Sequence, residues 1–426
     1  MDIAFPNWTL LLALIALVQM LLVLGNSVEN FRYASRRLTQ RHRWPWAPGR
    51  AALIVPCKGL DSRLEANLTA AMEQDYGDVE IVFVVQTSDD SACAVIKRLI
   101  DRFPRVAAQL VIAGRARVRG QKVHNLLAGL ERVSSDVRYL AFLDADARPA
   151  RDWLRLLLSR LDKAADLGAV TGYRWFVPLH PGIGNWLLYS LNNTIACLST
   201  SRGQSLVWGG SWVIKRETFE RIGLATAWQH TLSDDLVATK VMSQDHGLRI
   251  KFEPACVVPS PIDMNLSEAC SFLRRQLLLL RIFTPRWWLG LVTGTLISTA
   301  CNWFPLIWLG TSLVAGTEWD WPLALSLSMG FGQVARGVLR TRLARAYFPE
   351  HRQLLRSVML FDIIAAPLLG PFLLIAVLAS SIGRRVYWRE IRYELDARGD
   401  VLSTEHPAPR REAAHEPLPA KAVITH

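Results

Sequence analysis

The sequence predicts an α/β domain, built around a mostly parallel sheet and held between membrane segments. From residue 51 to about residue 261, short Val- and Ile-rich runs alternate with helical segments, and this βαβα order is typical of such a sheet. An apolar run precedes this region, and further apolar segments follow it. The chain is 51% apolar and holds 16 Trp, yet its formal net charge is +12. This combination indicates a membrane protein with a cationic cytoplasmic face.

The basic residues and the cysteines narrow the class of protein. Lys and Arg flank the apolar segments instead of forming one stripe, which disfavours nucleic-acid binding. The six cysteines are scattered and form no CxxC pair. This usage fits reduced thiols in a cytosolic compartment and argues against a disulfide framework or a zinc site.

Residues 1–45 are predicted to form a transmembrane anchor and a basic linker. The run "WTLLLALIALVQMLLVLG", residues 8–25, is long enough to span a bilayer and is followed by no A-x-A cleavage site. We therefore expect an anchor rather than a removed signal peptide, with a buried core helix as the alternative. By the positive-inside rule, the domain that follows lies in the cytoplasm, since five arginines stand after the run: Arg32, Arg36, Arg37, Arg41 and Arg43.

Residues 46–265 are assigned to the α/β domain. Strands are predicted in "AALIVPCKG", "VEIVFVVQT", "QLVIAG" and "YLAFLDADA", and helices in "LEANLTAAMEQDY", "ACAVIKRLIDRF" and "DWLRLLLSRLDKA". Ligands of parallel sheets sit beyond the carboxyl ends of the strands. Four aspartates follow strands at that end: Asp89, Asp90, Asp144 and Asp146.

Residues 266–395 are predicted to return the chain to the membrane, and residues 396–426 to form a disordered tail. Arginines among leucines at 266–283 suit a helix at the membrane interface, and apolar segments follow at 287–310, 321–335 and 358–382. Three full spans would put Arg384, Arg385 and Arg389 outside, against the positive-inside rule. The alternative is a re-entrant hairpin in the last segment, bent at Pro367 and Pro371. Both arrangements stay open at this point.

The pair Asp144 and Asp146, a D-x-D at the end of a strand, is the first candidate for chemistry. Its hard carboxylate oxygens suit Mg²⁺ or Mn²⁺, and such a metal can neutralise the diphosphate of a nucleotide-sugar. The motif alone is weak, because a solvated loop pair is the common explanation of two such aspartates.

Three further features point to the same site. Asp90, in "QTSDDSA", stands where a base or ribose could be bound, and "GQKVHN" brings Lys122, which can neutralise phosphate, and Asn125. The stretch "SDDL" follows "WGGSW" and offers Asp234 and Asp235. A carboxylate there could accept the proton of an acceptor hydroxyl. The alternative is a charge that favours a helix N-terminus.

The order of "PCKG", "QTSDDSA", "GQKVHNL", "DADA", "WGGSWVIKRE" and "SDDL" resembles ceramide glucosyltransferase and its bacterial relatives, which are membrane enzymes of the inverting GT-A class. The resemblance runs from about residue 53 to residue 395 and includes the ending "YWREIRYEL". It implies a GT-A fold, in which Asp90 matches the first aspartate of the family. Asp144 and Asp146 match its nucleotide and metal site, and Asp235 matches its general base.

One departure from the family concerns its (Q/R)-x-x-R-W motif, which is thought to hold the diphosphate and shape the acceptor end. In the best register, Arg275 is retained, while Leu278 and Leu279 stand in place of Arg-Trp. Arg274, Arg275 and Arg281 are the candidates to supply the missing positive charge.

The resulting prediction is a multi-pass integral membrane enzyme with a cytoplasmic catalytic domain, in the inner membrane if the source is bacterial. It would transfer a single sugar, with glucose as the leading candidate, from a UDP-sugar to a hydroxyl of a ceramide-like lipid. Asp235 is predicted to be the base, Asp144 and Asp146 to hold Mg²⁺ or Mn²⁺, and the following residues to bind the donor: Asp90, Lys122, Asn125, Asp144 and Arg275. The expected partners are the UDP-sugar and the lipid acceptor, with no nucleic acid.

Other functions remain open from the sequence. A processive polysaccharide synthase shares the aspartates, but it usually keeps Q-x-x-R-W and has more spans. The alternative that is not an enzyme is an inactive membrane scaffold that kept the fold. A hopanoid, sterol or diacylglycerol acceptor is open as well, and the sequence does not fix the sugar or the oligomeric state.

Overall fold

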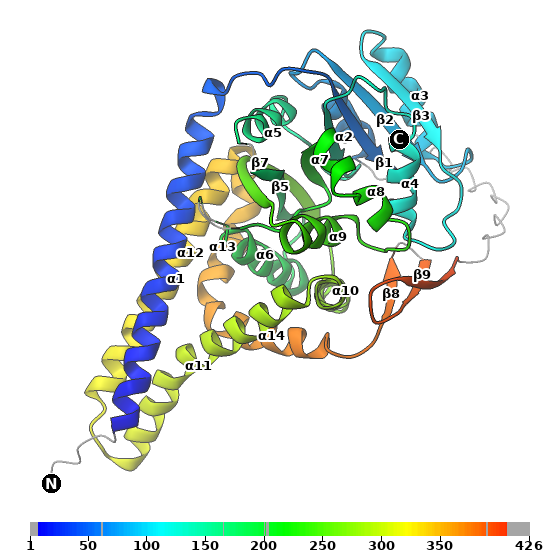
Figure 1. The fold of residues 1–426 in the computed structure, drawn as a ribbon. Helices are drawn as coiled ribbons and strands as arrows, with labels where there is room; N and C mark the ends of the chain where they lie inside the picture. The colour runs from blue at the N-terminus through cyan, green and yellow to red at the C-terminus, as the bar shows by residue number, and fades with distance from the viewer. Residues whose placement is uncertain are drawn as a thin grey trace, which may run out of the picture.

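The computed structural model describes residues 7–60, 63–164, 166–199, 201, 204–388 and 391–406. Its centre is a seven-stranded sheet of order β3-β2-β1-β4-β6-β5-β7 (Figure 1). The strands are β1 (Ala51–Pro56), β2 (Val79–Val85), β3 (Ala107–Ile112), β4 (Tyr139–Leu143), β5 (Leu167–Pro178), β6 (Ser211–Lys215) and β7 (Arg249–Ile262). All neighbours pair in parallel except β6, which is antiparallel to β4 and β5. The predicted α/β class with a mostly parallel sheet is confirmed.

Helices cover both faces of this sheet. Successive residues of a strand point to opposite faces, so Leu53 of β1 packs in one apolar core and Ile54 in the other. The first core includes residues of α2 (Leu64–Met72), α3 (Ala92–Arg102) and α5 (Trp153–Asp162). The second includes residues of α4 (Gln121–Leu130), α7 (Arg216–Arg221), α8 (Leu224–Ala227) and α9 (Asp234–Lys240), which continues into a π-helical turn, η2 (Val241–Asp245).

The long helices extend away from the sheet as a separate bundle. Helix α1 (Asn7–Thr39) packs along α12 (Asp320–Tyr347), and α11 (Pro285–Ala315) runs obliquely to them and contacts both (Figure 1). Within the described residues, two helices are long and apolar enough to cross a membrane, in the ranges Trp8–Thr39 and Pro285–Ala315. Segment 321–335, expected as a weak span, is part of the longer α12 and does not meet that criterion.

The last apolar segment is bent, and the chain then returns to the α/β domain. Helices α13 (Arg352–Ile364) and α14 (Ala366–Ala379) meet at 83°. Before the bend, after a short turn η3 (Pro349–His351), Leu355 packs with Trp175 of β5. After it, a small antiparallel sheet of β8 (Arg385–Trp388), β9 (Ile391–Leu395) and β10 (Val401–Glu405) shares the apolar core of α4. This bend fits one broken span as well as a re-entrant loop, so both arrangements left open by the sequence stay predictions.

The expectation of a disordered tail from residue 396 needs a correction. Residues 401–405 form β10, where Val401 N–H donates to the carbonyl of His230, 2.8 Å away. Apolar Val401 is buried against the domain and stabilises this strand, a contact that the polar composition of the tail concealed. Residues 407–426 lie outside the described residues, as do Arg389 and Glu390 of "YWREIRYEL".

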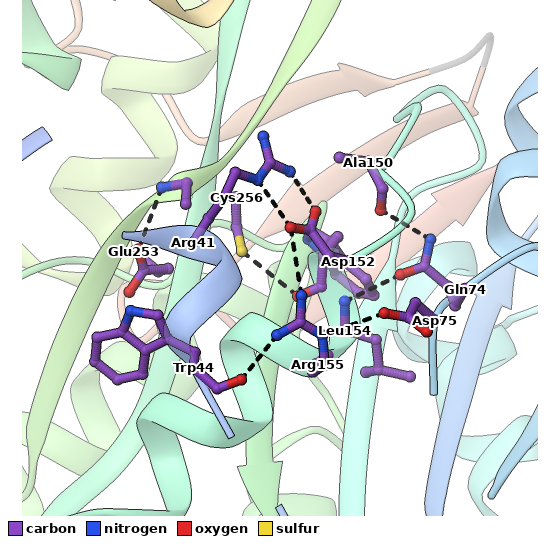
Figure 2. A network of polar contacts seen from close by, with 12 residues as sticks. Arg41, Trp44, Gln74, Asp75, Ala150, Asp152, Leu154, Arg155, Glu253 and Cys256 are labelled. Atoms are coloured by element: carbon purple, nitrogen blue, oxygen red, sulfur yellow. Dashed lines mark hydrogen bonds and ion pairs between the residues drawn. The ribbon is translucent and has the colours of Figure 1, made fainter. Parts of the chain in front are cut away.

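The basic linker after the anchor is bound firmly to the α/β domain. Arg37 forms a buried ion pair with Glu253 of β7, and its Nε donates to Oε1 at 2.9 Å. In the turn η1 (Arg41–Arg43), Arg41 Nε donates to Oδ2 of Asp152 at 2.8 Å (Figure 2). Arg155, on α5, donates to the carbonyl of Trp44 at 2.8 Å (Figure 2). The anchor and the sheet are therefore joined by buried and half-buried charges, not by a free linker.

Two helices connect the domain to the bundle. Helix α6 (Ile183–Ala196) follows β5, and α10 (Leu266–Phe283) coincides with the helix expected at 266–283. A reciprocal pair of hydrogen bonds starts α10: Asn265 accepts from the N–H of Glu268, and Glu268 accepts from the N–H of Asn265. Leu277 of α10 packs with Leu187 and Leu191 of α6 and with Val377 of α14.

Candidate functional site

A cavity of about 1230 Å³ runs from the carboxyl edge of the sheet into the helical bundle. Its first part is lined from β1, β4, α4 and α9, and its second part from α6, α10, α11, α12 and α14. Most residues that the sequence singled out line the first part: Lys122, Asn125, Asp144, Asp146, Asp234 and Asp235, while Arg275 of α10 lines the second. The parallel topology explains this gathering, since β1 and β4 are neighbours and end at the same edge.

Lys122 is the centre of the acidic cluster. Its Nζ lies 2.8 Å from Oδ1 of Asp144, 3.3 Å from Oδ2 of Asp234 and 3.2 Å from the carbonyl oxygen of Gly209. Burial alone would lower the pKa of Lys122, but the surrounding carboxylates, including Asp235, raise it overall. Lys122 is therefore charged at neutral pH and holds the strand end, the glycine turn and α9 together.

Burial acts in the opposite direction on the two aspartates paired with Lys122. Burial raises the pKa of Asp234 to about 7, against the lowering effect of Lys122. Burial likewise raises the pKa of Asp144, an effect that Lys122 opposes and Asp146 reinforces. The sequence left open that Asp234 is only a helix-start charge. In the structure its carboxylate is buried and faces Lys122.

Asp235 has a different environment from its neighbour. Its Oδ1 accepts hydrogen bonds from the hydroxyl of Ser233 at 2.6 Å and from the N–H of Leu236 at 2.8 Å. Its Oδ2 accepts from the N–H of Gly209 at 3.0 Å. Asp235 is half-buried and lines the cavity, whereas Asp234 is only 1% exposed. A group that enters the cavity therefore meets an oriented carboxylate at Asp235.

Because Gly209 has no side chain, the charged groups of Lys122, Asp234 and Asp235 can lie close to its backbone. A Cβ at this position would lie 2.7 Å from Oδ2 of Asp234, 2.8 Å from Nζ of Lys122 and 3.1 Å from Oδ2 of Asp235. Any side chain would displace at least one charged group. The "WGG" turn is thus a close approach of backbone to the acidic cluster, which a glycine permits.

Asp90 does not line the cavity. Its Oδ1 accepts hydrogen bonds from the N–H groups of Gly59 and Ala92, both at 2.9 Å. Gly59 has φ of +68°, so the loop after β1 takes a left-handed turn that Asp90 holds in place. Cys57 and Lys58 of the same loop line the cavity. Direct contact of Asp90 with a nucleotide stays a prediction, and the visible role of Asp90 is to shape this loop.

Asn125 belongs to a polar network at the start of α4. Its Oδ1 accepts from Nε2 of Gln121 at 2.8 Å, and Gln121 also bonds the backbone of Gly114 and Ala116. The N–H of Gln121 donates to the hydroxyl of Tyr393, 3.2 Å away. Tyr393, part of "YWREIRYEL", lines the cavity, so the C-terminal sheet contributes a wall of the site.

The sequence did not single out Arg174. It lies on β5 and lines the cavity, and its guanidinium lies 5.2 Å from the ring centre of Phe176, 5.7 Å from that of Trp208 and 5.4 Å from that of Phe272. No carboxylate of the described residues lies within ion-pair distance of it. The only sequence signal is an arginine inside an apolar strand, "GAVTGYRWFVP".

Arg275 lies near Arg174 across the cavity. It stacks on Phe272 at 5.2 Å and donates weakly to the carbonyl of Tyr387 at 3.4 Å. Burial and the charge of Arg174 lower the pKa of Arg275, as expected for two cations that share an enclosed space. Leu278 and Leu279, which replace Arg-Trp of the family motif, pack instead in the apolar core with Ile391 of β9.

The donor set at Asp144 and Asp146 fits a hard divalent cation. Both carboxylates line the cavity, and the charge of Asp146 raises the pKa of Asp144, so the two share one electrostatic site. Among the described residues, no group of three or more His, Cys, Asp or Glu side chains forms a metal cage. Mg²⁺ is commonly bound by one or two carboxylates together with substrate phosphates, and this pair suits that mode.

Sequence comparison defines the class of protein. The profile described as glycosyl transferase family 21 matches residues 8–401, from the anchor to the C-terminal sheet. The chain belongs to this family.

Individual relatives match over shorter stretches. The ceramide glucosyltransferase of Komagataella phaffii is 26% identical over 167 residues, which are 38% of this chain and 32% of that relative. Ceramide glucosyltransferase 3 of Caenorhabditis elegans is 25% identical over 119 residues, 28% of this chain and 26% of that relative. The aligned stretches thus span a third or less of these relatives.

Solved structures show a distant likeness of the fold. The mannosyltransferase PcManGT from Pyrobaculum calidifontis, in complex with GDP-Man and Mn²⁺, gives a TM-score of 0.45 at 18% identity and covers 87% of this chain and 97% of its own. Glucosyl-3-phosphoglycerate synthase from Mycobacterium tuberculosis, in complex with Mn²⁺, UDP and glucosyl-3-phosphoglycerate, gives a TM-score of 0.36 at 16% identity and covers 55% and 79% of the two chains.

Proposed function

We propose that this protein transfers a single sugar, glucose first among the candidates, from a UDP-sugar to a hydroxyl of a ceramide-like membrane lipid. The observation that carries the proposal is the continuous cavity, which joins an acidic, lysine-centred site at the sheet edge to the membrane helices. A water-soluble donor and a lipid acceptor can meet in such a space without the lipid leaving the bilayer. The family and the relatives named above support the choice of sugar and acceptor.

The donor binds at the carboxyl ends of β1 and β4. The loop that Asp90 holds lies beside the nucleoside, and Lys122 and Asn125 stand at the start of α4. Arg174 and Arg275 face the diphosphate, because they are cavity cations without a carboxylate partner among the described residues. When bound at Asp144 and Asp146, Mg²⁺ or Mn²⁺ would supply positive charge that stabilises the departing UDP.

Asp235 is the general base of the reaction. The acceptor oxygen attacks the anomeric carbon, the bond from that carbon to the UDP oxygen breaks, and the hydroxyl proton passes to the Asp235 carboxylate. The configuration inverts because this is a single displacement. The hydrogen bonds from Ser233, Leu236 and Gly209 fix the orientation of the base before the acceptor arrives.

The acceptor enters from the bundle. The residues of α11 that line the cavity include the small Gly290, Gly294 and Ser298, and Pro367 and Gly370 of α14 lie on the cavity wall as well. Small residues leave a path for an acyl chain beside α10. We place the α/β domain in the cytoplasm, since Arg32 to Arg43 follow the first span. Labelling of an engineered cysteine in residues 51–265 by an impermeant reagent outside intact cells, after removal of the native cysteines, would contradict this placement.

The decisive experiment supplies the purified protein in lipid nanodiscs with several labelled UDP-sugars and a panel of ceramide, hopanoid, sterol and diacylglycerol. Mass analysis of the lipids should show one added hexose on ceramide. Asp144→Ala should abolish this product, while Asp101→Asn, which removes an exposed carboxylate of α3, should not. A ladder of added sugars would favour a polysaccharide synthase, and the absence of any sugar transfer or UDP-sugar hydrolysis would favour an inactive scaffold.

A further inference from the structure

The membrane end of the cavity holds a polar cluster that the proposed reaction does not use. Nε2 of Gln333 donates to Oδ1 of Asn302 at 2.8 Å, and Oε1 of Gln333 accepts from Nη1 of Arg336 at 3.2 Å. All three line the cavity, together with Gln19 of α1. The cluster therefore lies where α1, α11 and α12 meet.

Arg336 brings a positive charge that the described part of the chain does not neutralise. No carboxylate there lies within 4 Å of its guanidinium nitrogens, and its Nε is buried without an acceptor. One turn along α12, Arg340 is paired with buried Asp362 at 2.8 Å. Asp362 is thus used by Arg340, and no second carboxylate of the described residues pairs with Arg336. An uncompensated charge in an enclosed, poorly hydrated site is costly, and an external anion would remove that cost.

The cluster lies on the bundle side of the contact between α1 and the α/β domain. On α1, the side chains of Asn26 and Asn30 donate to the carbonyls of Cys197 and Ser199, where the bundle meets the α/β domain. Gln19 lies two helical turns before Asn26, which is about 10 Å at 1.5 Å per residue. Val23 lies beside the polar groups and Leu369 is in the lining of the same cavity, and both are apolar, as an acyl chain requires.

We propose that this end of the cavity binds the phosphate group of an anionic phospholipid, held by Arg336 with Gln333 and Asn302. The lipid is a second ligand of the protein and not the sugar acceptor. Its phosphate accepts hydrogen bonds from the guanidinium and the amides, and its acyl chains lie along the apolar walls. The site does not depend on sugar transfer, so binding of this lipid is measurable in protein that has no turnover.

The test uses the full-length protein in nanodiscs of neutral phosphatidylcholine, titrated with phosphatidylglycerol and followed by native mass spectrometry. Arg336→Gln should weaken phosphatidylglycerol binding roughly 10- to 100-fold, the range expected for lost hydrogen bonds to a charged group. Arg336→Lys keeps the charge and should retain most of the affinity. Arg342→Gln removes an exposed charge from the same helix and should leave the affinity unchanged.

Two outcomes would overturn the proposal. Equal losses in Arg336→Gln and Arg342→Gln would mean that phosphatidylglycerol responds only to general surface charge. Inorganic phosphate that raises the thermal midpoint of the wild type in neutral nanodiscs as much as phosphatidylglycerol does would mean a site for free anions and not for a lipid. The comparison of phosphate with phosphatidylglycerol uses only the wild-type protein. It therefore tests the proposal even if Arg336→Gln fails to fold. Loss of lipid binding with intact sugar transfer, or the reverse, separates this proposal from the proposed function.

Discussion

The ammonium group of Lys122 lies 2.8 Å from Oδ1 of Asp144, so a protein cation already faces one of the two carboxylates proposed to hold a metal. A divalent ion must share Asp144 with Lys122 or displace it. We expect sugar transfer to stop after thorough chelation and to return with Mn²⁺ or Mg²⁺. Because two carboxylates leave most coordination positions open, metal affinity should rise when UDP is bound. Initial rates against free Mn²⁺, with and without UDP, test both points, and undiminished transfer after chelation would count against the metal.

Replacing Asp235 should affect turnover far more than donor binding. Asp235→Asn keeps the size of the side chain but cannot accept a proton at neutral pH, and kcat should fall by about 10²- to 10⁴-fold. The dissociation constant of the UDP-sugar should stay near normal, the pattern of an interaction made only in the transition state. Asp234→Asn is the comparison, because Asp234 also lines the cavity but is only 1% exposed and is paired with Lys122. If Asp234→Asn abolishes turnover while Asp235→Asn does not, the base is the other carboxylate.

Gly209→Ala should reduce activity without unfolding the protein. The added methyl would stand within 3 Å of Asp234 and Lys122 and would push the charges apart. We expect at least a tenfold loss of kcat/KM, about 1.4 kcal/mol of transition-state stabilisation. Gly77→Ala is the matched control, since a Cβ there meets nothing within 4 Å. Equal activity of the two variants would show that the WGG turn accommodates a methyl group without displacing the charged groups.

Arg174→Gln should weaken donor binding through the phosphates. Arg174 has aromatic neighbours and no acidic partner among the described residues, so its charge is available to a diphosphate. We expect the affinity for UDP to fall roughly tenfold while that for uridine, which lacks phosphates, stays unchanged. Calorimetric titration with both ligands measures the difference. A similar loss for uridine would assign Arg174 to the shape of the pocket instead.

Breaking the buried pair of Arg37 and Glu253 should lower the free energy of unfolding much more than breaking an exposed pair. Arg37→Met leaves the Glu253 carboxylate buried and unpaired, which typically costs about 3–5 kcal/mol. Adding Glu253→Met should recover a large part of that loss. Arg249→Met breaks the exposed pair with Asp166 and should cost about 1 kcal/mol or less. Thermal unfolding in detergent compares the four proteins, and equal midpoints for Arg37→Met and Arg249→Met would contradict the prediction.

The sequence predicted elements that depend on local pattern. The apolar runs that became β1, β2 and β4 and the helix at 266–283 were found because their periodicity and flanking residues suffice. The long strands β5 and β7 were not predicted, since they are stabilised by pairing across about 80 residues of sequence. The contact between Lys122 and Asp144 could not be predicted from the sequence either, because it depends on how α4 packs against β1 and β2. Arg174 was missed for the same reason.

The C-terminal sheet sets the order in which the protein can mature. Tyr393 supports the first turn of α4, Val401 bonds the backbone of His230, and Thr404 Oγ1 donates to the carbonyl of Arg117. These contacts close the site with residues that the ribosome makes after α11, α12 and the bent pair α13 and α14. A nascent chain therefore holds the aspartates and Lys122, and the helices long and apolar enough to cross a membrane, before it has the wall that completes their pocket. Under the proposed function, synthesis of the membrane segments would come before catalytic competence, and the site would be completed only where the proposed lipid acceptor lies.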